Sequence, residues 1–505
     1  MERLRGDRRN HAVVLGGSIA GLAAARALSG HFKRVTVVER DELPEAAAVR
    51  KGTPQAAHVH GLLASGYRVL DGYFPGLMDE LVAGGGRIGD TTGDLLWFHF
   101  GHWKLRADCG LQGIMVTRPA LEAAVRRHVR RLLNVTLLTG HDVGAPVFDA
   151  KARRVSGVVT KERITNADAT LPADLVVDAL GRGSPSAKWL SAWGFGDVPE
   201  ETVNIDVGYA TAMFERRPGD LGGKSGMVVG RIPPDQTRHG VALHAEGGRW
   251  TVTLTGVLGD HPPADFAAWK EFARSLPVPQ IFDLVGGRQP LGPIATYRFA
   301  ANRRRFYPQM KSFPAGFLTL GDSWCSFNPI YAQGMSVALG QAKVLDGCLA
   351  QGDERLASRF FSLAGPLADW AWTIATGEDL RFPAVVGKRS PAAAIMHRYL
   401  ERVHQAASRD PVVLRRFFEV ASLLAPPTSL LAPAIAWRVL AGGVGAKPGE
   451  SVEEFVGAQS LRVATLGAAK PRGNPPGRRA GRPCETASGE TAAPVACTGS
   501  VDASR

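Results

Sequence analysis

Glycines and a carboxylate near the start of the chain are spaced for binding a dinucleotide. The turn GGSIAG (16–21) lies between an apolar run at 11–15 and an Ala-rich run at 22–28, and VTVVER (35–40) follows. Gly16 permits a tight turn, and Gly21 permits a helix to pack closely on a strand. The start of that helix then faces the charge of a pyrophosphate. The pattern predicts two strands and a helix around an FAD or NAD site.

The acidic end of the second strand narrows this prediction. Glu39 falls where a carboxylate accepts hydrogen bonds from an adenosine ribose, which favours FAD or NAD over NADP. We count the neighbouring Arg40 among the cofactor-binding candidates. Ser18 replaces the second glycine of the pattern, where the backbone approaches a pyrophosphate. A purely structural turn is the alternative.

A second group of candidates lies in GDSWCSFNPIYAQGMS (321–336), directly after the apolar run 317–320. Asp322 falls at the carboxyl edge of a predicted parallel sheet, where it can hold hydroxyl groups such as those of a flavin ribityl chain. Pro329 shapes the loop that follows. Gly334 and Met335 begin a helix whose free N–H groups can face the flavin N1 and C2 oxygen. The alternative is a strand, a turn and a capped helix without a ligand.

Five motifs together resemble one enzyme family over roughly the first 350 residues. They are GGSIAG…VVER (16–40), RKGTPQAAHVHGLL (50–63), TRPALEAAV (117–125), DALGRGSPS (178–186) and GDSWCSFNPIYAQGMS (321–336). Their order and spacing resemble the FAD-dependent aromatic hydroxylase superfamily, the group A flavoprotein monooxygenases. Within it, the chain looks most like FAD-dependent oxidoreductases of actinobacterial natural-product pathways, including polyene epoxidases.

The resemblance implies roles for further residues. Arg50 would contact the pyrophosphate or adenosine side of FAD, and Arg118 would approach the cofactor from the start of its helix. Asp178 would belong to a turn associated with both FAD and the passing NADPH, together with Gly181 and Ser184. Ser323 and Ala332 stand where the superfamily more often has Ala and Gly.

The resemblance also implies the reaction. FAD would stay bound, NADPH or NADH would bind transiently and reduce it, and oxygen would add at the flavin C4a position. The resulting hydroperoxide would hydroxylate or epoxidise a largely apolar, secondary-metabolite-type substrate. No protein nucleophile is needed, so no catalytic residue is assigned. His58 and His60 alone do not make a metal site, and none is predicted.

These motifs require an α/β fold. We expect a Rossmann-like FAD-binding domain of the GR2 type in 1–200 and 300–350, with 91–109 contributing to the substrate side. Alternating runs such as 203–214 and 249–257 predict an antiparallel β-sheet substrate domain at 201–299. A C-terminal helical region at 351–466, including helices within 368–382 and 451–466, and a disordered tail at 467–505 complete the chain. Most aromatic residues of DLLWFHFGHWKL (94–105) are expected in the core.

Composition excludes several classes of protein. The chain has 505 residues, is 45% hydrophobic and 21% charged, and carries a formal net charge of +13 without the aromatic stripe typical of nucleic-acid binding. No uninterrupted apolar stretch has transmembrane length. Five scattered cysteines suit the reducing cytoplasm. The predicted partners are an apolar small molecule and O₂, with no nucleic acid and an unknown oligomeric state.

Three functions stay open. The first is an FAD-dependent monooxygenase. The second is a flavin-dependent reductase or dehydrogenase of an isoprenoid or polyene substrate, which oxygen incorporation into product would exclude. The third is a non-catalytic binding protein with the FAD fold. A flavin halogenase is a further enzyme variant and is less favoured.

Overall fold

The computed structural model describes residues 9–442. The predicted helix at 451–466 and the predicted disordered tail at 467–505 lie outside the described residues. The described residues include three buried cysteines that form no disulfide: Cys109, Cys325 and Cys348. None of the helices within 9–442 combines the length and the apolar composition that crossing a bilayer would need.

A five-stranded parallel sheet forms the first layer. Its strands, in spatial order, are β17 (Phe317–Thr319), β11 (Leu175–Asp178), β1 (Arg9–Leu15), β2 (Phe32–Val38) and β7 (Val135–Leu138). The predicted strands at 11–15, 35–40 and 317–320 are confirmed by β1, β2 and β17, although β2 ends at Val38 and β17 at Thr319. Because all five strands run the same way, the residues that follow β1, β2, β11 and β17 meet at one edge of the sheet.

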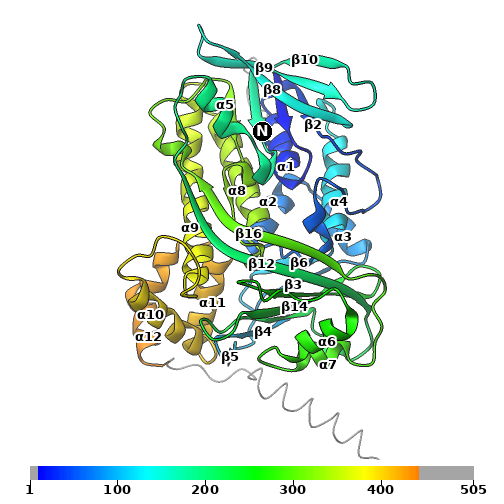
Figure 1. Cartoon of the computed structure of the whole chain (residues 1–505), viewed down its shortest axis with the longest axis vertical. Helices are drawn as coiled ribbons and strands as arrows, with labels where there is room; N and C mark the ends of the chain where they lie inside the picture. The colour runs from blue at the N-terminus through cyan, green and yellow to red at the C-terminus, as the bar shows by residue number, and fades with distance from the viewer. Residues whose placement is uncertain (1–8, 443–505) are drawn as a thin grey trace, which may run out of the picture. The chain divides into compact units, whose positions relative to one another are not determined.

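Helices pack against this sheet through small and apolar side chains. The segment after β1 forms α1 (Ile19–Ser29), in which alanines and leucines are almost completely buried. Figure 1 shows α1 beside α8 (Gly334–Leu349), with α4 (Arg118–Arg130) nearby. The remaining helices of this part are α2 (Ala64–Tyr73), α3 (Leu77–Ala83) and α5 (Ser186–Ala192).

An eight-stranded sheet forms the second layer. Its order is β18 (Cys325–Ser326), β16 (Ala295–Arg305), β12 (Glu200–Glu215), β15 (Arg249–Gly256), β14 (Arg238–Ala245), β13 (Gly226–Val229), β4 (Leu95–His99) and β5 (His102–Trp103). The predicted antiparallel strands at 203–214 and 249–257 are confirmed, since β12 pairs with β15 antiparallel. Segment 91–109 therefore adds two strands, β4 and β5, to the sheet built mainly from 200–305.

The two faces of this sheet differ in chemistry. Along β12, Ala210, Ala212 and Phe214 point to one side, where they join an apolar core with residues of α6 (Phe266–Arg274) and α7 (Gln280–Val285). Because side chains alternate along a strand, Tyr209 and Thr211 point to the other side. Figure 1 shows α6 and α7 on the side of the sheet away from α1 and α8. The hydroxyl-bearing face is therefore turned toward the parallel-sheet layer.

Smaller elements complete the fold. A three-stranded antiparallel sheet contains β10 (Asp168–Pro172), β9 (Arg154–Glu162) and β8 (His141–Asp149), and β3 (Arg87–Asp90) pairs with β6 (Gln112–Met115). After α8 the chain is helical through α9 (Leu356–Asp379), α10 (Ala393–Ala406), α11 (Pro411–Ala421) and α12 (Pro433–Leu440). Phe98 and Trp103 pack edge to face with centroids 5.2 Å apart, so the core position expected for most aromatics of 94–105 is confirmed for this pair.

Lys104 joins the β4–β5 hairpin to α10. Its side chain is 2% exposed, and its Nζ donates to the carbonyl oxygens of His99 and His404, each at 3.0 Å. Burial lowers the pKa of Lys104 to about 7. In the unfolded chain a lysine has a pKa of about 10.4, so the unfolded state binds more protons than the folded state between these two values.

This difference predicts that stability rises with pH. Between pH 7 and pH 9, Lys104 should add up to about 2 kcal/mol to the unfolding free energy. Lys104→Met fills a similar volume without a charge, and it should remove most of that rise. Urea unfolding of both proteins at pH 7 and pH 9 measures the effect. Equal pH dependence in the two proteins would contradict a lowered pKa for Lys104.

Candidate functional site

The predicted turn between β1 and α1 has the expected geometry. Gly16 has φ +101°, and a Cβ at this position would lie 2.6 Å from the carbonyl oxygen of Ala179. A Cβ on Gly21 would lie 1.8 Å from the carbonyl oxygen of Gly16. Both positions therefore need glycine. Ser18 has an extended backbone, φ −88° and ψ −174°, which a serine adopts without strain.

Glu39 lies at the end of β2 and ties this turn to the sheet. Its carboxylate accepts from the Gly17 N–H at 2.8 Å and from the Asp41 N–H at 3.0 Å. A ligand hydroxyl at Glu39 would therefore share oxygens that the backbone already uses. Each carboxylate oxygen accepts more than one hydrogen bond, so this sharing is compatible with the predicted ribose contact.

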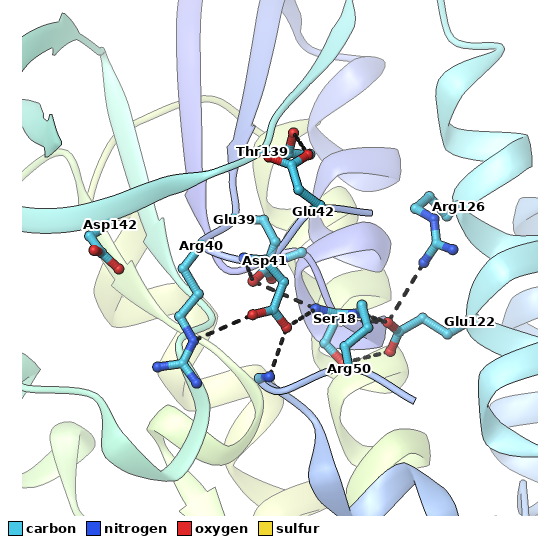
Figure 2. A network of polar contacts seen from close by, with 12 residues as sticks. Ser18, Glu39, Arg40, Asp41, Glu42, Arg50, Glu122, Arg126, Thr139 and Asp142 are labelled. Atoms are coloured by element: carbon cyan, nitrogen blue, oxygen red, sulfur yellow. Dashed lines mark hydrogen bonds and ion pairs between the residues drawn. The ribbon is translucent and has the colours of Figure 1, made fainter. Parts of the chain in front are cut away.

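Buried charges link Arg50 to α4, as Figure 2 shows. The Glu122 carboxylate, which sequence reasoning missed, accepts from Arg50 Nη2 at 2.6 Å, from Ser18 Oγ at 2.9 Å and from Arg118 Nη2 at 3.1 Å. Arg50 Nη1 also binds Asp41 at 3.0 Å. The two predicted arginines and Ser18 therefore belong to one network. The neighbouring Arg118 and Arg50 guanidinium groups hold the pKa of Glu122 below its usual value despite burial.

Arg118 keeps one donor without a partner. Its Nε is buried and has no acceptor among the described residues, although its Nη2 is shared by Ser18 and Glu122. The start of α4 is itself held in place, because Glu246 from the β14–β15 turn accepts from the Thr117 N–H and hydroxyl. A buried guanidinium donor that faces no acceptor of the chain suits an anionic ligand.

A hollow of about 840 Å³ opens beside this network. Arg40 and Arg50, both predicted from the sequence, line it together with Asp41, Lys51 and Arg163. Arg163 comes from the loop after β9, and no sequence pattern pointed to it. The hollow begins at the carboxyl end of β2, where an adenosine group would lie in a dinucleotide-binding fold.

Asp178, also predicted from the sequence, is completely buried at the end of β11. Its carboxylate accepts from the Ser184 hydroxyl, from the Leu180 N–H at 2.9 Å and from the Ser323 hydroxyl at 3.0 Å. Burial raises the pKa of Asp178 although these hydrogen bonds oppose the shift. The side chain therefore connects the 181–186 turn with the turn after β17, and its role here is to position them.

Asp322 presents the opposite situation. Asp322 is an exposed residue, and no described residue donates a hydrogen bond to its carboxylate. Desolvation by the surrounding protein raises the pKa of Asp322 to about 6, although Arg182, Arg118 and Arg303 oppose the shift. Gly334 at the start of α8 lies close by, since a Cβ there would be 3.6 Å from Asp322 Oδ1.

The starts of α1 and α8 share one property. No described side chain caps either helix at its N-cap residue, Ser18 for α1 and Gln333 for α8. Gly321 lies near α1, because a Cβ at this glycine would be 3.0 Å from the Cβ of Ala20. The two helix starts therefore border the same edge of the parallel sheet and present unpaired N–H groups there.

Asp379 of α9 holds the loop that carries Pro329 in place. This buried carboxylate accepts from Asn302 Nδ2 and from the Tyr331 hydroxyl, each at 2.8 Å, and from Asn328 Nδ2 at 3.0 Å. Arg231 forms an ion pair with Asp379 at 3.3 Å. Met335 follows in the first turn of α8 and is 8% exposed. The loop therefore enters α8 in one defined direction.

Ala332 has a conformation that favours glycine. Its φ is +56° and its ψ is 23°, in the left-handed region. For a residue with a Cβ this conformation costs roughly 1–2 kcal/mol. The alanine at position 332 therefore adds backbone strain but does not change the path of the loop, because the loop keeps the conformation that a glycine would give it.

The described residues 9–442 contain no group of three or more His, Cys, Asp or Glu side chains that could hold a metal ion. His58 and His60 lie instead beside the eight-stranded sheet, where His58 Nδ1 and Thr211 Oγ1 are 2.7 Å apart. Burial lowers the pKa of His58 to about 4 and that of His60 to about 3.

No protein-family model matches the chain. Protein Rv3254 of Mycobacterium tuberculosis is 34% identical to it over 455 residues, which cover 85% of this chain and 94% of that protein. Solved structures that share its fold include the following two. PqsL, a probable FAD-dependent monooxygenase from Pseudomonas aeruginosa, is 17% identical with a TM-score of 0.54 over 74% of this chain and 99% of its own. A flavoprotein/dehydrogenase from Cytophaga hutchinsonii is 14% identical with a TM-score of 0.61 over 86% and 100%.

The Glu122 network predicts a large effect on stability. Glu122→Ala leaves the buried Arg118 and Arg126 without their carboxylate partner, and it should lower the unfolding free energy by about 3 kcal/mol. Glu271→Ala, which removes an exposed partner of Arg274, is the matched control and should change it by less than about 0.5 kcal/mol. Urea unfolding measures both. A loss at Glu122 as small as that at Glu271 would show that the network contributes little.

Proposed function

We propose that the chain, which belongs to the same family as Protein Rv3254 of Mycobacterium tuberculosis, is an FAD-dependent monooxygenase. It would use NADPH or NADH and O₂ to hydroxylate or epoxidise a largely apolar small molecule. Its mixed α/β fold, shared with flavin-dependent monooxygenases and dehydrogenases, supports the assignment to a flavoprotein. Within that group, the sequence motifs favour the oxidoreductases of actinobacterial natural-product pathways.

One observation carries the proposal. Two helices begin without a side-chain cap at the edge where Asp322 has no hydrogen-bond donor among the described residues and Arg118 Nε has no acceptor there. FAD offers what these groups lack: phosphate oxygens for the N–H groups and the guanidinium, and ribityl hydroxyls for the carboxylate. A nicotinamide dinucleotide has no open sugar-alcohol chain. The residues present therefore fit FAD.

The cofactor-binding residues divide along the length of FAD. Glu39, Arg40 and Arg50 would hold the adenosine end, and the two arginines line the 840 Å³ hollow. Gly16, Ser18, Gly21 and Arg118 would surround the pyrophosphate. Asp322, Pro329, Gly334 and Met335 would hold the ribityl chain and the ring, and Asp178 would position the turns between them. When bound, flavin supplies electron transfer from the nicotinamide and activation of oxygen.

The chain's own residues would control access and orientation. The hydroxyl-bearing face of the eight-stranded sheet would form one wall of the substrate site. Tyr209 donates to Asn328 Oδ1 at 3.3 Å, which joins that face to the loop at 328–333. We propose that the chain acts in the cytoplasm, where nicotinamide cofactors are reduced and its buried cysteines stay free.

A second function has support from the fold. A flavin-dependent reductase or dehydrogenase would need the same FAD site, and one structure of this fold is a flavoprotein/dehydrogenase. The two functions differ in the fate of oxygen. Incorporation of labelled oxygen from ¹⁸O₂ into the product supports the monooxygenase, whereas a reduced or desaturated product without the label supports the alternative.

The proposal predicts a coloured protein. Purified chain should show the visible flavin bands, and anaerobic addition of NADPH or NADH should bleach them. The visible spectrum, followed in one sealed cuvette, measures both. Flavin bands that neither nicotinamide bleaches would favour a non-catalytic binding protein. A colourless chain that refuses added FAD would refute the assignment of the site.

Replacing Asp322 should have opposite effects on FAD binding and on the stability of the FAD-free protein. Asp322→Ala should lower the FAD content of the purified protein, because the ribityl hydroxyls lose their acceptor. Desolvation raises the pKa of Asp322 to about 6, so its ionised form opposes folding above that pH. At pH 8 the FAD-free variant should therefore melt at a higher temperature than the FAD-free parent. Flavin absorbance and thermal unfolding measure the two effects. Unchanged FAD content would exclude this role.

A further inference from the structure

A second hollow, of about 390 Å³, lies between the segment 47–60 and the hydroxyl-bearing face of the eight-stranded sheet. Most of its wall is apolar and includes Val116, Met213, Leu243 and Pro293. Val49 and Leu291, also in the wall, are 49% and 57% exposed. This volume and lining are typical of a pocket for a small, largely apolar molecule.

Two polar side chains in this wall have an atom without a partner. His58 is 5% exposed and Thr251 is 7% exposed, and both line the hollow. His58 Nε2 and Thr251 Oγ1 are buried and form no hydrogen bond with a described residue. Buried polar groups in proteins are nearly always paired, so two unpaired atoms beside one apolar hollow indicate a ligand that carries oxygen.

Several other polar side chains of the wall already form hydrogen bonds. Glu246 accepts both hydrogen bonds from Thr117, and Arg249 Nε donates to the Glu246 carbonyl oxygen. His244 Nε2 lies 2.9 Å from the carbonyl oxygen of Gly85. His58 and Thr251 therefore offer the buried, unpaired atoms that can orient a bound molecule.

We propose that this hollow binds the substrate, and that His58 donates a hydrogen bond from Nε2 to a neutral oxygen, such as a phenol or ketone oxygen, on an otherwise apolar molecule. The inference rests on the proposed function for the reaction that the bound molecule then undergoes. It goes further in naming the oxygen that the substrate must carry and the residues that recognise it.

A chain of hydrogen bonds sets the tautomer of His58. The Val59 N–H, which can only donate, binds Thr253 Oγ1 at 3.0 Å. Thr253 Oγ1 lies 2.6 Å from Thr211 Oγ1, which lies 2.7 Å from His58 Nδ1. Neither threonine hydroxyl has another acceptor among the described residues, so only the order Thr253 to Thr211 to His58 Nδ1 gives both hydroxyl protons a partner. In this order Nδ1 accepts and the ring proton sits on Nε2.

The surroundings keep this imidazole neutral and in place. Its ring lies 5.6 Å from the ring of Tyr209 and 5.9 Å from that of Tyr297, measured between centroids. Burial lowers the pKa of His58 to about 4, so the ring is uncharged at neutral pH. A neutral donor favours a neutral oxygen, whereas a carboxylate would need a charged partner to compensate for its desolvation.

The test compares 1-naphthol with naphthalene, two probes that differ by one hydroxyl and fit the volume of the hollow. Fluorescence titration of the FAD-loaded protein should give 1-naphthol a preference of about fivefold to tenfold, the size expected for one hydrogen bond. His58→Leu should abolish the preference. His58→Gln should retain much of it, because its amide nitrogen lies near the position of the imidazole Nε2. Thr251→Val should reduce the preference, and it supplies the test if His58→Leu does not fold.

Thr255→Val is the matched control, since Thr255 lies on the same sheet face outside the hollow, and it should keep the preference. Equal affinity for the two probes, no binding of either, or an unchanged preference in folded His58→Leu overturns the proposal. If His58→Leu does not fold, an unchanged preference in Thr251→Val overturns it. Binding that appears only without FAD also overturns it, because the hollow would then belong to the cofactor. Bleaching by NADPH or NADH is recorded on the same samples, so a failed oxidoreductase assignment is distinguished from a failed binding site.

Discussion

The unpaired N–H groups at the starts of α1 and α8 are the constraint on which the rest of the structure depends. Each helix start needs negative charge or oxygen, and both are held at one edge of a parallel sheet. The glycines at 16 and 21 bring α1 close to that edge, and the loop fixed by Asp379 aims α8 at it. The network around Glu122 then keeps arginines there and balances their charge. Binding of an anionic, hydroxyl-bearing ligand follows from this convergence.

The sequence predicted the parts that depend on local pattern. The strand–turn–helix around Gly16, the strand before Gly321 and the helix from Gly334 were recognisable because period, glycine spacing and helix starts are local properties. Ser18 looked like a departure, yet its hydroxyl binds Glu122. Glu122 itself was foreseeable in part, since it lies one helical turn after Arg118 and can share its partners. Arg163 and Asp379 had no local signal, because only the tertiary fold brings them to the site.

The eight-stranded sheet separates two tasks between its faces. One face is sealed by α6 and α7 around Trp250 and Trp269, which supplies a rigid core. The other face carries threonines and tyrosines. Tyr209 is paired with Asn328 of the loop at 328–333 and Thr211 with His58, whereas the buried hydroxyl of Thr251 has no partner among the described residues. A rigid sheet with a polar face can therefore hold a small molecule while its shape is maintained from behind.

The strand order of the parallel sheet also determines the order in which the two layers can fold during synthesis. β17 pairs with β11, yet five strands of the eight-stranded sheet, β12 to β16, lie between them in the sequence. During synthesis β11 must wait as an uncovered edge until the whole inserted layer has left the ribosome, and uncovered edges favour aggregation. The two layers are therefore nested rather than consecutive. A fragment that stops before 317 would lack a strand of its first layer, so the natural unit of this protein for expression and for evolution is both layers together.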